Sequence, residues 1–177
     1  MEKVKTFLAD ISDLLNEKNY QKIYEKVPAF RQEKADRLKH REDQAQSVGA
    51  WYLWMKIQER HKIPQDAGQS FNLSHSGKYV LCSAGVSGER VGCDIECMRK
   101  YHERLAEKYF CSSEYERIRN ADEAERTEMF YRYWVLKESF LKATRKGLVM
   151  GLNTSEIQIP KQGDPFFLRK RSGKLII

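Results

Sequence analysis

Residues 71–96 read FNLSHSGKYVLCSAGVSGERVGCDIE, and the predicted fold class depends on this stretch. Lys78 to Ala84 is apolar and rich in residues that favour strands, and Glu89 to Glu96 is a second strand candidate. Gly85 to Gly88 would form the turn that joins them. We therefore expect a β-hairpin near the middle of the chain.

Helical patterns lie on both sides of this hairpin. The apolar spacing predicts helices over 13–26, 29–40, 43–60, 101–110, 113–120 and 125–144. Ser112 or Ser113 would cap the fifth helix, and Gly147 would end the last. Residues 3–9 fit either a strand or a helical stripe, and we favour the strand because Ser12 and Asp13 are good helix caps.

Three short strands are expected near the C-terminus, around Ile157–Ile159, Phe166–Leu168 and Ile176–Ile177. His61 to Ser70 carries a proline and a glycine, and it is expected to be a loop. Helices interleaved with hairpins are typical of an α+β fold.

Composition limits the class of protein. The chain has 177 residues, of which 41% are hydrophobic and 11% aromatic, which is enough for a core and excludes global disorder. No apolar stretch is long enough to span a bilayer, and no apolar signal core follows Met1. The four cysteines form no CxxC pair, so we expect reduced thiols and a cytoplasmic location.

The net charge of +7 favours partners that are polyanionic. Nucleic acid is the weakest of these, because no nucleic-acid-binding motif is present and the basic residues alternate with acidic ones. Phosphorylated cofactors and acidic proteins remain as alternatives.

Asp94 and Glu96 are two residues apart, so on a strand both carboxylates would lie on one face. Two adjacent carboxylates repel each other unless a cation or a proton lies between them, and carboxylate oxygens suit Mg²⁺. The alternative is a solvated acidic face on an edge strand, which the bare pattern favours.

Residues 134–142 read WVLKESFLK, in which Trp134, Glu138 and Lys142 are spaced four apart and share a helical face. Glu138 could be a third metal ligand beside a phosphate-binding Lys142. The alternative is an ordinary ion pair on a helix surface.

Ser74, His75 and Ser76 offer a set of donors that suits a phosphate. The alternative is a turn whose hydroxyls bond to their own backbone. The chain contains no Walker A loop, GxGxxG, HExxH or GxSxG motif, so those nucleotide-binding and hydrolase classes have no support.

Taken together, these pieces resemble a known family. FNLSHSGKYVLC, VGCDIE and WVLKESFLKATRKGL, in this order, are similar to the 4′-phosphopantetheinyl transferases, as are KYFCSSEYERI and VPAFRQEKADRLKHRED. The resemblance covers most of residues 20–150. It is to the surfactin-synthetase-activating type rather than to the short trimeric holo-acyl-carrier-protein synthases.

The resemblance implies that the chain transfers the 4′-phosphopantetheine arm of coenzyme A to a serine of an apo carrier protein and releases adenosine 3′,5′-bisphosphate. It also implies a pseudodimer of two similar half-domains, 1–97 and 98–177, with the active site in the cleft between them. Carrier proteins are typically acidic around the modified serine, so a basic face would steer them; Arg37, Lys39 and Arg41 are candidates for it.

The resemblance also implies roles for individual residues. Asp94, Glu96 and Glu138 would hold Mg²⁺ against the coenzyme A pyrophosphate, and Lys142, with Lys137 beside it, would neutralise that pyrophosphate. His75, with Ser74 close by, would contact the 3′-phosphate. Glu114 would be the base for the carrier serine, a role that a metal-bound water could also fill. Arg31, Lys34 and Ser47 match positions around the same 3′-phosphate.

The chain departs from the family pattern in three places. The Gly-Lys-Pro element that contacts adenine is absent before Asn72, and Gln46 stands where an arginine is often found. The chain also stops at Ile177, earlier than is usual, so the last strands of the second half-domain are expected to be missing. The alternative function is therefore a catalytically impaired homologue that binds coenzyme A or a carrier protein.

Overall fold

The computed structural model describes residues 4–63, 70–85, 90–101, 103–145, 151–160, 165–168 and 174–176. The chain divides into two units, unit 1 (Met1–Cys97) and unit 2 (Met98–Ile177). Each unit contains helices and an antiparallel sheet, as the expected α+β class requires.

Unit 1 is built on a three-stranded antiparallel sheet with the order β1-β3-β2. The strands are β1 (Val4–Asp10), β2 (Phe71–Ser76) and β3 (Tyr79–Gly85). Alternate residues of β1 are exposed, which is the period expected for a half-buried strand, so the strand predicted for residues 3–9 is confirmed.

The predicted hairpin of residues 78–84 and 89–96 is wrong. β3 pairs with the preceding segment β2, and residues 90–97 form no strand. Phe71 and Leu73 pack into the core, but the last three residues of β2 are all polar, so only two apolar positions marked the strand. The turn of the real hairpin is at Gly77, and the predicted turn residues 86–88 lie outside the described residues.

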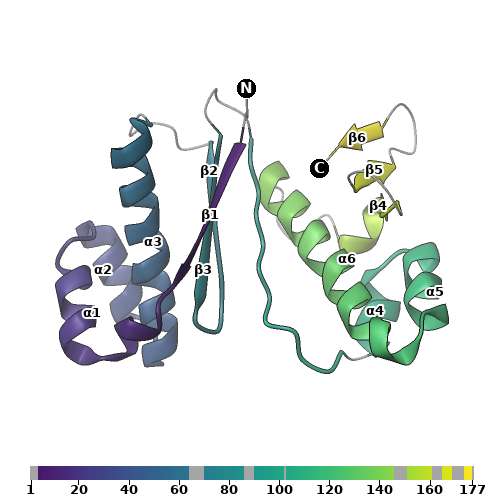
Figure 1. Cartoon of the computed structure of the whole chain (residues 1–177), viewed down its shortest axis with the longest axis horizontal. Coiled ribbons are helices and arrows are strands. Elements are labelled where there is room, and N and C mark those ends of the chain that lie inside the picture. Colours follow the sequence, from purple (N-terminus) through teal and green to yellow (C-terminus); the bar gives the residue numbers. More distant parts are fainter. Residues whose placement is uncertain are drawn as a thin grey trace. The chain divides into compact units, whose positions relative to one another are not determined.

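Helix α3 (Arg41–His61) covers one face of this sheet (Figure 1). Trp54 and Ile57 of the helix pack against Cys82 and Ala84 of the sheet. Two shorter helices, α1 (Glu17–Tyr24) and α2 (Ala29–Asp36), pack on the other side of α3, around Val48.

The helix predicted for residues 13–26 is interrupted. A single 3₁₀ turn, η1 (Ser12–Leu15), comes first, and α1 begins after Asn16. Asn16 has extended backbone, and its Oδ1 accepts the N–H of Asn19 at 3.3 Å, so its side chain caps a new helix.

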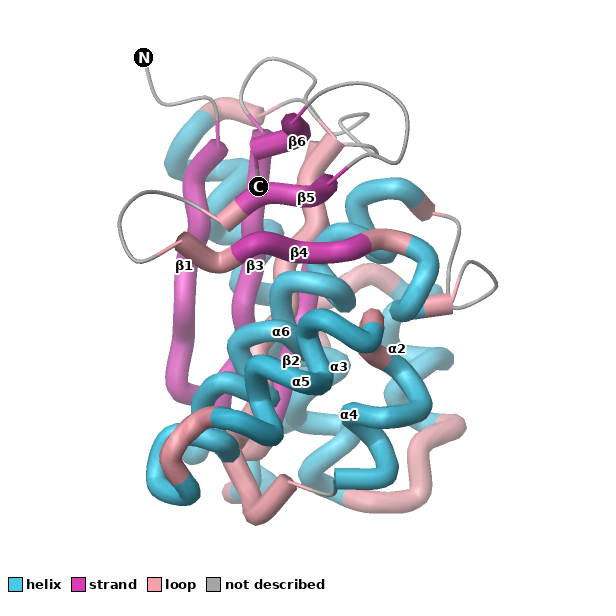
Figure 2. Tube along the Cα trace, turned by 90° about the vertical axis from the view of Figure 1, so that its right-hand side faces the viewer, coloured by secondary structure: helices cyan, strands magenta, loops and turns pink. Residues whose placement is uncertain are grey.

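Unit 2 consists of three helices and a small sheet. The elements are α4 (Glu103–Tyr109), α5 (Ser112–Asn120), α6 (Glu123–Thr144), the 3₁₀ turn η3 (Leu152–Thr154), β4 (Glu156–Gln158), β5 (Phe166–Leu168) and β6 (Lys174–Ile176). Figure 2 shows the three short strands side by side, in the order β4-β5-β6. The core of the unit is formed by Phe110, Ile118, Phe130, Tyr133 and Ile157.

The helices of unit 2 lie close to the predicted ranges, but their ends differ. α5 is capped by Cys111 rather than by Ser112 or Ser113, because the Cys111 side chain and Glu114 form a reciprocal capping box. α6 ends at Thr144, after which Arg145 has a φ of 57°. Gly147 lies outside the described residues. In the described part of the chain, no helix has the length and apolarity that crossing a membrane requires.

Candidate functional site

Strand β2 holds the extended segment 93–97 through its polar side chains. Asn72 Oδ1 accepts the N–H of Cys93 at 3.3 Å, and Ser74 Oγ accepts that of Ile95 at 3.3 Å. Ser76 Oγ accepts the N–H of Cys97 at 3.0 Å. Each pair is 21 residues apart in the chain, so the segment runs parallel to β2 in constant register. Side-chain oxygens of β2 thus accept the backbone N–H groups of segment 93–97, which in a β-strand would bond to backbone carbonyl oxygens of a neighbouring strand.

The same serines hold the two carboxylates. Ser74 Oγ donates to Asp94 Oδ1 at 2.8 Å, and Ser76 Oγ donates to Glu96 Oε2 at 3.1 Å. Ser74 is buried, Asp94 is half-buried and Glu96 is exposed. Because Ser74 and Ser76 lie on one face of β2, Asp94 and Glu96 are held on the same side of their segment. The shared side expected from their spacing is therefore present, although the segment is not a strand.

This pair fits a magnesium ion in its donor chemistry. Mg²⁺ prefers oxygen ligands and is usually bound through one or two carboxylates, with substrate phosphate and water completing its shell. Asp94 and Glu96 supply two such carboxylates within unit 1. Within the described ranges, no group of three or more His, Cys, Asp or Glu side chains forms a metal site, and Glu138 belongs to unit 2.

Arg31 of α2 forms a second feature of unit 1. Its Nη1 donates to Ser47 Oγ of α3 at 3.5 Å, and its guanidinium carbon lies 4.3 Å from the centre of the Trp51 ring. Its Nε is buried without a hydrogen-bond partner among the described residues. No carboxylate in the described part of the chain pairs with this guanidinium, and burial lowers its pKa. A half-buried cation without a counter-ion is suited to binding an anion.

Three other positions singled out in the sequence also lie in unit 1, on α2, α3 and β2. Lys34 is exposed on α2, three residues after Arg31, and His75 is exposed on β2. Gln46 is buried, and its Nε2 donates to the carbonyl oxygen of Gly77 at 2.8 Å. It therefore ties α3, next to Ser47, to the β2–β3 turn.

In unit 2, helix α6 carries Lys137, Glu138 and Lys142. Glu138 and Lys142 are half-buried, one helical turn apart, and share a face as the sequence predicted. Lys137 points elsewhere: its side chain is 1% exposed and forms an ion pair of 2.8 Å with Glu114, which is 0% exposed.

The rest of the contacts of this pair are also internal. Lys137 Nζ donates to the carbonyl oxygens of Leu152 and Ser155 at 2.8 and 2.6 Å. Glu114 accepts the N–H groups of Cys111 and Ile157 at 2.8 and 2.7 Å. The Glu114 carboxylate and the carbonyl oxygens of Leu152 and Ser155 thus provide one acceptor for each of the three N–H groups of the Lys137 ammonium. The geometry therefore disagrees with the expectation that Lys137 contacts a phosphate and that Glu114 is a base.

A signal for this inward lysine is present in the sequence. The buried residues of α6 are Phe130, Tyr133, Lys137 and Leu141, which recur at the helical spacing of three and four. Lys137 occupies a position in that buried stripe where an apolar residue is normal. Leu136 and Phe140 of the same helix are half-buried.

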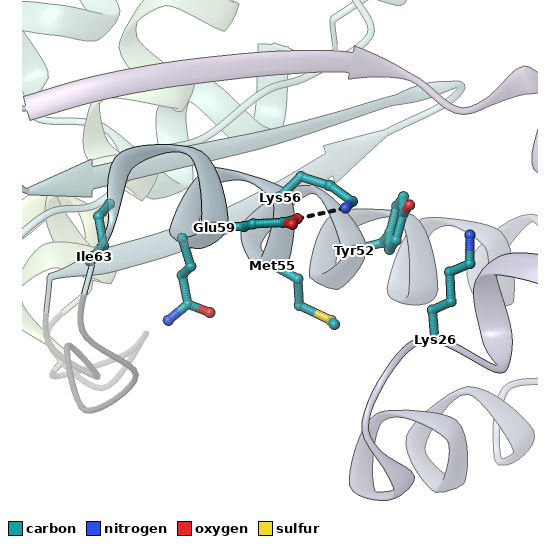
Figure 3. Close-up of a pocket in the computed structure, with 7 residues that line it drawn as sticks. Lys26, Tyr52, Met55, Lys56, Glu59 and Ile63 are labelled. Carbon is teal, nitrogen blue, oxygen red and sulfur yellow. Dashed lines mark hydrogen bonds and ion pairs between the residues drawn. The ribbon is translucent and has the colours of Figure 1, made fainter.

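Two surface hollows lie elsewhere. One of about 550 Å³ lies along α3 and contains the Lys56–Glu59 ion pair beside Tyr52 (Figure 3). Another, of about 1010 Å³, lies in unit 2 and is lined by residues of α5, α6 and 158–160. None of the predicted site residues lines either hollow.

Comparison with protein families finds one match. Residues 90–175 match the model of the 4′-phosphopantetheinyl transferase superfamily. The chain is thus similar to this superfamily over its C-terminal part. The matched range includes Asp94, Glu96, Glu114, Glu138 and Lys142 and begins after Arg31 and Ser47.

Individual members of the superfamily are similar over different lengths. The chain is 34% identical over 101 residues to the 4′-phosphopantetheinyl transferase Sfp of Bacillus subtilis (strain 168), which covers 57% of this chain and 44% of that protein. It is 29% identical over 155 residues to a 4′-phosphopantetheinyl transferase of Bacillus subtilis, covering 77% and 68%.

A putative 4′-phosphopantetheinyl transferase of Synechocystis sp. is 39% identical over 85 residues, which covers 47% of this chain and 34% of that protein. The match to this protein, like that to Sfp, thus spans less than half of the relative's length.

Proposed function

We propose that the chain transfers the 4′-phosphopantetheine arm of coenzyme A to a serine hydroxyl of an apo carrier protein. The serine oxygen forms a bond to the phosphorus of the arm, the pyrophosphate bond breaks, and adenosine 3′,5′-bisphosphate leaves. The observation that carries this proposal is the superfamily match, which includes an acidic pair that Ser74 and Ser76 hold on one side of segment 93–97.

Asp94 and Glu96, together with Glu138, would hold Mg²⁺. When bound, the ion would neutralise charge on the pyrophosphate, which is the main requirement of phosphoryl transfer. Ser74 and Ser76 orient the carboxylates, so their hydroxyls serve the metal ligands rather than a phosphate. Unit 2 would supply Glu138 as the second half of a pseudodimer of residues 1–97 and 98–177.

The substrate phosphates would be bound by basic residues. Arg31 and Ser47, with Lys34 and His75, would contact the 3′-phosphate, and the lack of a counter-ion at Arg31 supports this assignment. Lys142 would contact the pyrophosphate from the same helical face as Glu138. Lys137 and Glu114 have a structural role in this proposal, so the carrier serine needs a base other than Glu114.

The carrier protein would be acidic around its serine. A net charge of +7 favours its approach through long-range attraction, which makes transfer sensitive to salt. We place the reaction in the cytoplasm, in keeping with four cysteines that are all unpaired.

Intact-mass spectrometry tests the activity directly. An apo carrier protein, coenzyme A and Mg²⁺ are incubated with the full chain, and a matched sample contains EDTA. The carrier is expected to gain the mass of one phosphopantetheine arm only when Mg²⁺ is present. Asp94→Ala should abolish the gain, whereas Asp122→Ala, an exposed residue without a side-chain cap bond, should keep it. Near-normal turnover by Asp94→Ala would overturn the assignment.

A non-catalytic role is the second candidate. The burial of Lys137 and Glu114 in an internal ion pair favours it, because the expected base and one expected pyrophosphate contact are both committed to structure. A binding module for coenzyme A or a carrier protein would bind without Mg²⁺ and transfer nothing. Calorimetry with coenzyme A, in EDTA and in Mg²⁺, distinguishes it from the enzyme when no mass gain is seen.

A further inference from the structure

Phe30, in the first turn of α2, is an aromatic residue with 55% of its surface exposed. Its ring lies edge-on to that of Trp51, with 5.0 Å between the ring centres and 87° between the planes. The Arg31 guanidinium lies 5.9 Å from the centre of the Phe30 ring and 4.3 Å from that of Trp51. Two aromatic rings thus flank one cation.

The inner ring of this pair is anchored to the core. Trp51 lies edge-on to Phe71 at 5.9 Å, and Phe71 stacks on Trp54 at 4.1 Å with 8° between the planes. Trp54 is only 2% exposed. The aromatic series therefore runs from a buried stack to an exposed end at Phe30.

The chemistry of this surface specifies its ligand. Among the described residues, the Arg31 guanidinium bonds to the Ser47 hydroxyl, and no acidic side chain pairs with the guanidinium. A ligand that satisfies both features carries an anion for the guanidinium and a flat ring for Phe30. A purine nucleotide with a phosphate on its ribose has both, because the base and the phosphate are attached to one sugar.

We propose that Phe30 and Trp51 form the stacking site for the adenine base of coenzyme A, beside a 3′-phosphate held by Arg31 and Ser47. This inference rests on the proposed function. It also offers a replacement for the Gly-Lys-Pro element that is absent before Asn72. Adenine binding then depends on α2 and α3 instead of on that loop.

Calorimetry with adenosine 3′,5′-bisphosphate tests the site without catalysis. Phe30→Ala is expected to weaken binding about tenfold or more, because stacking of a base on an aromatic side chain has about that effect. Phe30→Tyr should bind like the wild type, whereas Phe30→Leu, which keeps apolar area but no ring, should be weak. Leu15→Ala removes another exposed apolar side chain, outside this site, and should change nothing.

Two further probes separate the base from the phosphate. A ribose 3,5-bisphosphate analogue without a base should bind equally to the wild type and to Phe30→Ala. Arg31→Met should lose the preference for adenosine 3′,5′-bisphosphate over adenosine 5′-monophosphate, whereas Phe30→Ala should weaken both nucleotides by the same factor.

The outcomes distinguish this inference from the proposed function. If Phe30→Ala binds adenosine 3′,5′-bisphosphate as tightly as the wild type does, the stacking site is wrong and the transfer activity is unaffected. If the wild-type chain binds neither this nucleotide nor coenzyme A and the carrier gains no mass, both proposals are wrong.

Discussion

Lys137 of α6 and Glu114 of α5 form an ion pair of 2.8 Å in the interior of unit 2, with side chains that are 1% and 0% exposed. The pair also binds four backbone groups, at Cys111, Leu152, Ser155 and Ile157. It thus connects two helices to η3 and β4. A buried pair of this kind is costly to break from one side, because the remaining charge has no partner.

Lys137→Met should therefore destabilise the chain by about 3–5 kcal/mol in urea unfolding. It leaves a buried carboxylate and two unsatisfied carbonyl oxygens. Arg132→Met, an exposed change on the same helix, should stay within about 0.5 kcal/mol of the wild type. The double variant Lys137→Met/Glu114→Gln should lose less than the sum of the two single changes, since neither charge is then left alone. Additive losses would show that the pair is not coupled.

The serine contacts of segment 93–97 predict a local effect on amide exchange. Ser74→Ala removes the acceptor of the Ile95 N–H and the donor to Asp94, at a cost of about 1–3 kcal/mol. Hydrogen exchange at Ile95 should quicken more than at Cys97, whose N–H is held by Ser76. Ser76→Ala should show the reverse order. Equal exchange at both amides in both variants would contradict the register of this segment.

Gly77 is predicted to resist substitution for two reasons. Its φ is +54°, and an added Cβ would lie 2.9 Å from Cys97 Sγ. Gly77→Ala should cost about 1–2 kcal/mol from backbone strain alone, and more with the contact. In a Cys97→Ala background the cost should fall to the strain alone. A cost that is the same in both backgrounds would exclude the steric contribution.

Asp10 gives a pH dependence whose sign is set by its hydrogen bonds. Hydrogen bonds from the Ser12 hydroxyl, from Lys78 and from the Ser12 N–H lower the pKa of Asp10 from 3.8 to about 2. The ionised carboxylate therefore favours the folded state above about pH 4, and this contribution is lost as the pH falls through about 2. The stability difference between the wild type and Asp10→Asn should narrow over that window in acid unfolding. A constant difference would contradict the lowered pKa.

Local sequence patterns were sufficient for several parts of the fold. Helices α3 and α6 are long and periodic, and both were predicted to within two residues at each end. The strand at Val4–Asp10 follows from the cap residues after it. The spacing of Asp94 and Glu96 correctly placed their carboxylates on one side.

Other parts needed contacts that no local pattern contains. Strand β2 alternates apolar and polar residues, but its polar side chains bind a segment 21 residues later in the chain instead of water. The hairpin is therefore formed by β2 and β3, and not by residues 78–84 and 89–96 as predicted. The exposed ring of Phe30 beside Arg31 likewise depends on Trp51, which comes from another helix.

The sequence by itself determined the resemblance to the superfamily, the main helices and the identity of the acidic and basic residues, because these depend on residue type and near-neighbour spacing. Only the tertiary structure decided which of these charges stay at the surface. Lys137 and Glu138 are consecutive, yet the rotation of about 100° per residue along a helix turns one into the core and leaves the other half-exposed. Lys137 finds its counter-charge at Glu114, and a contact between two helices at that distance in the chain is set by packing.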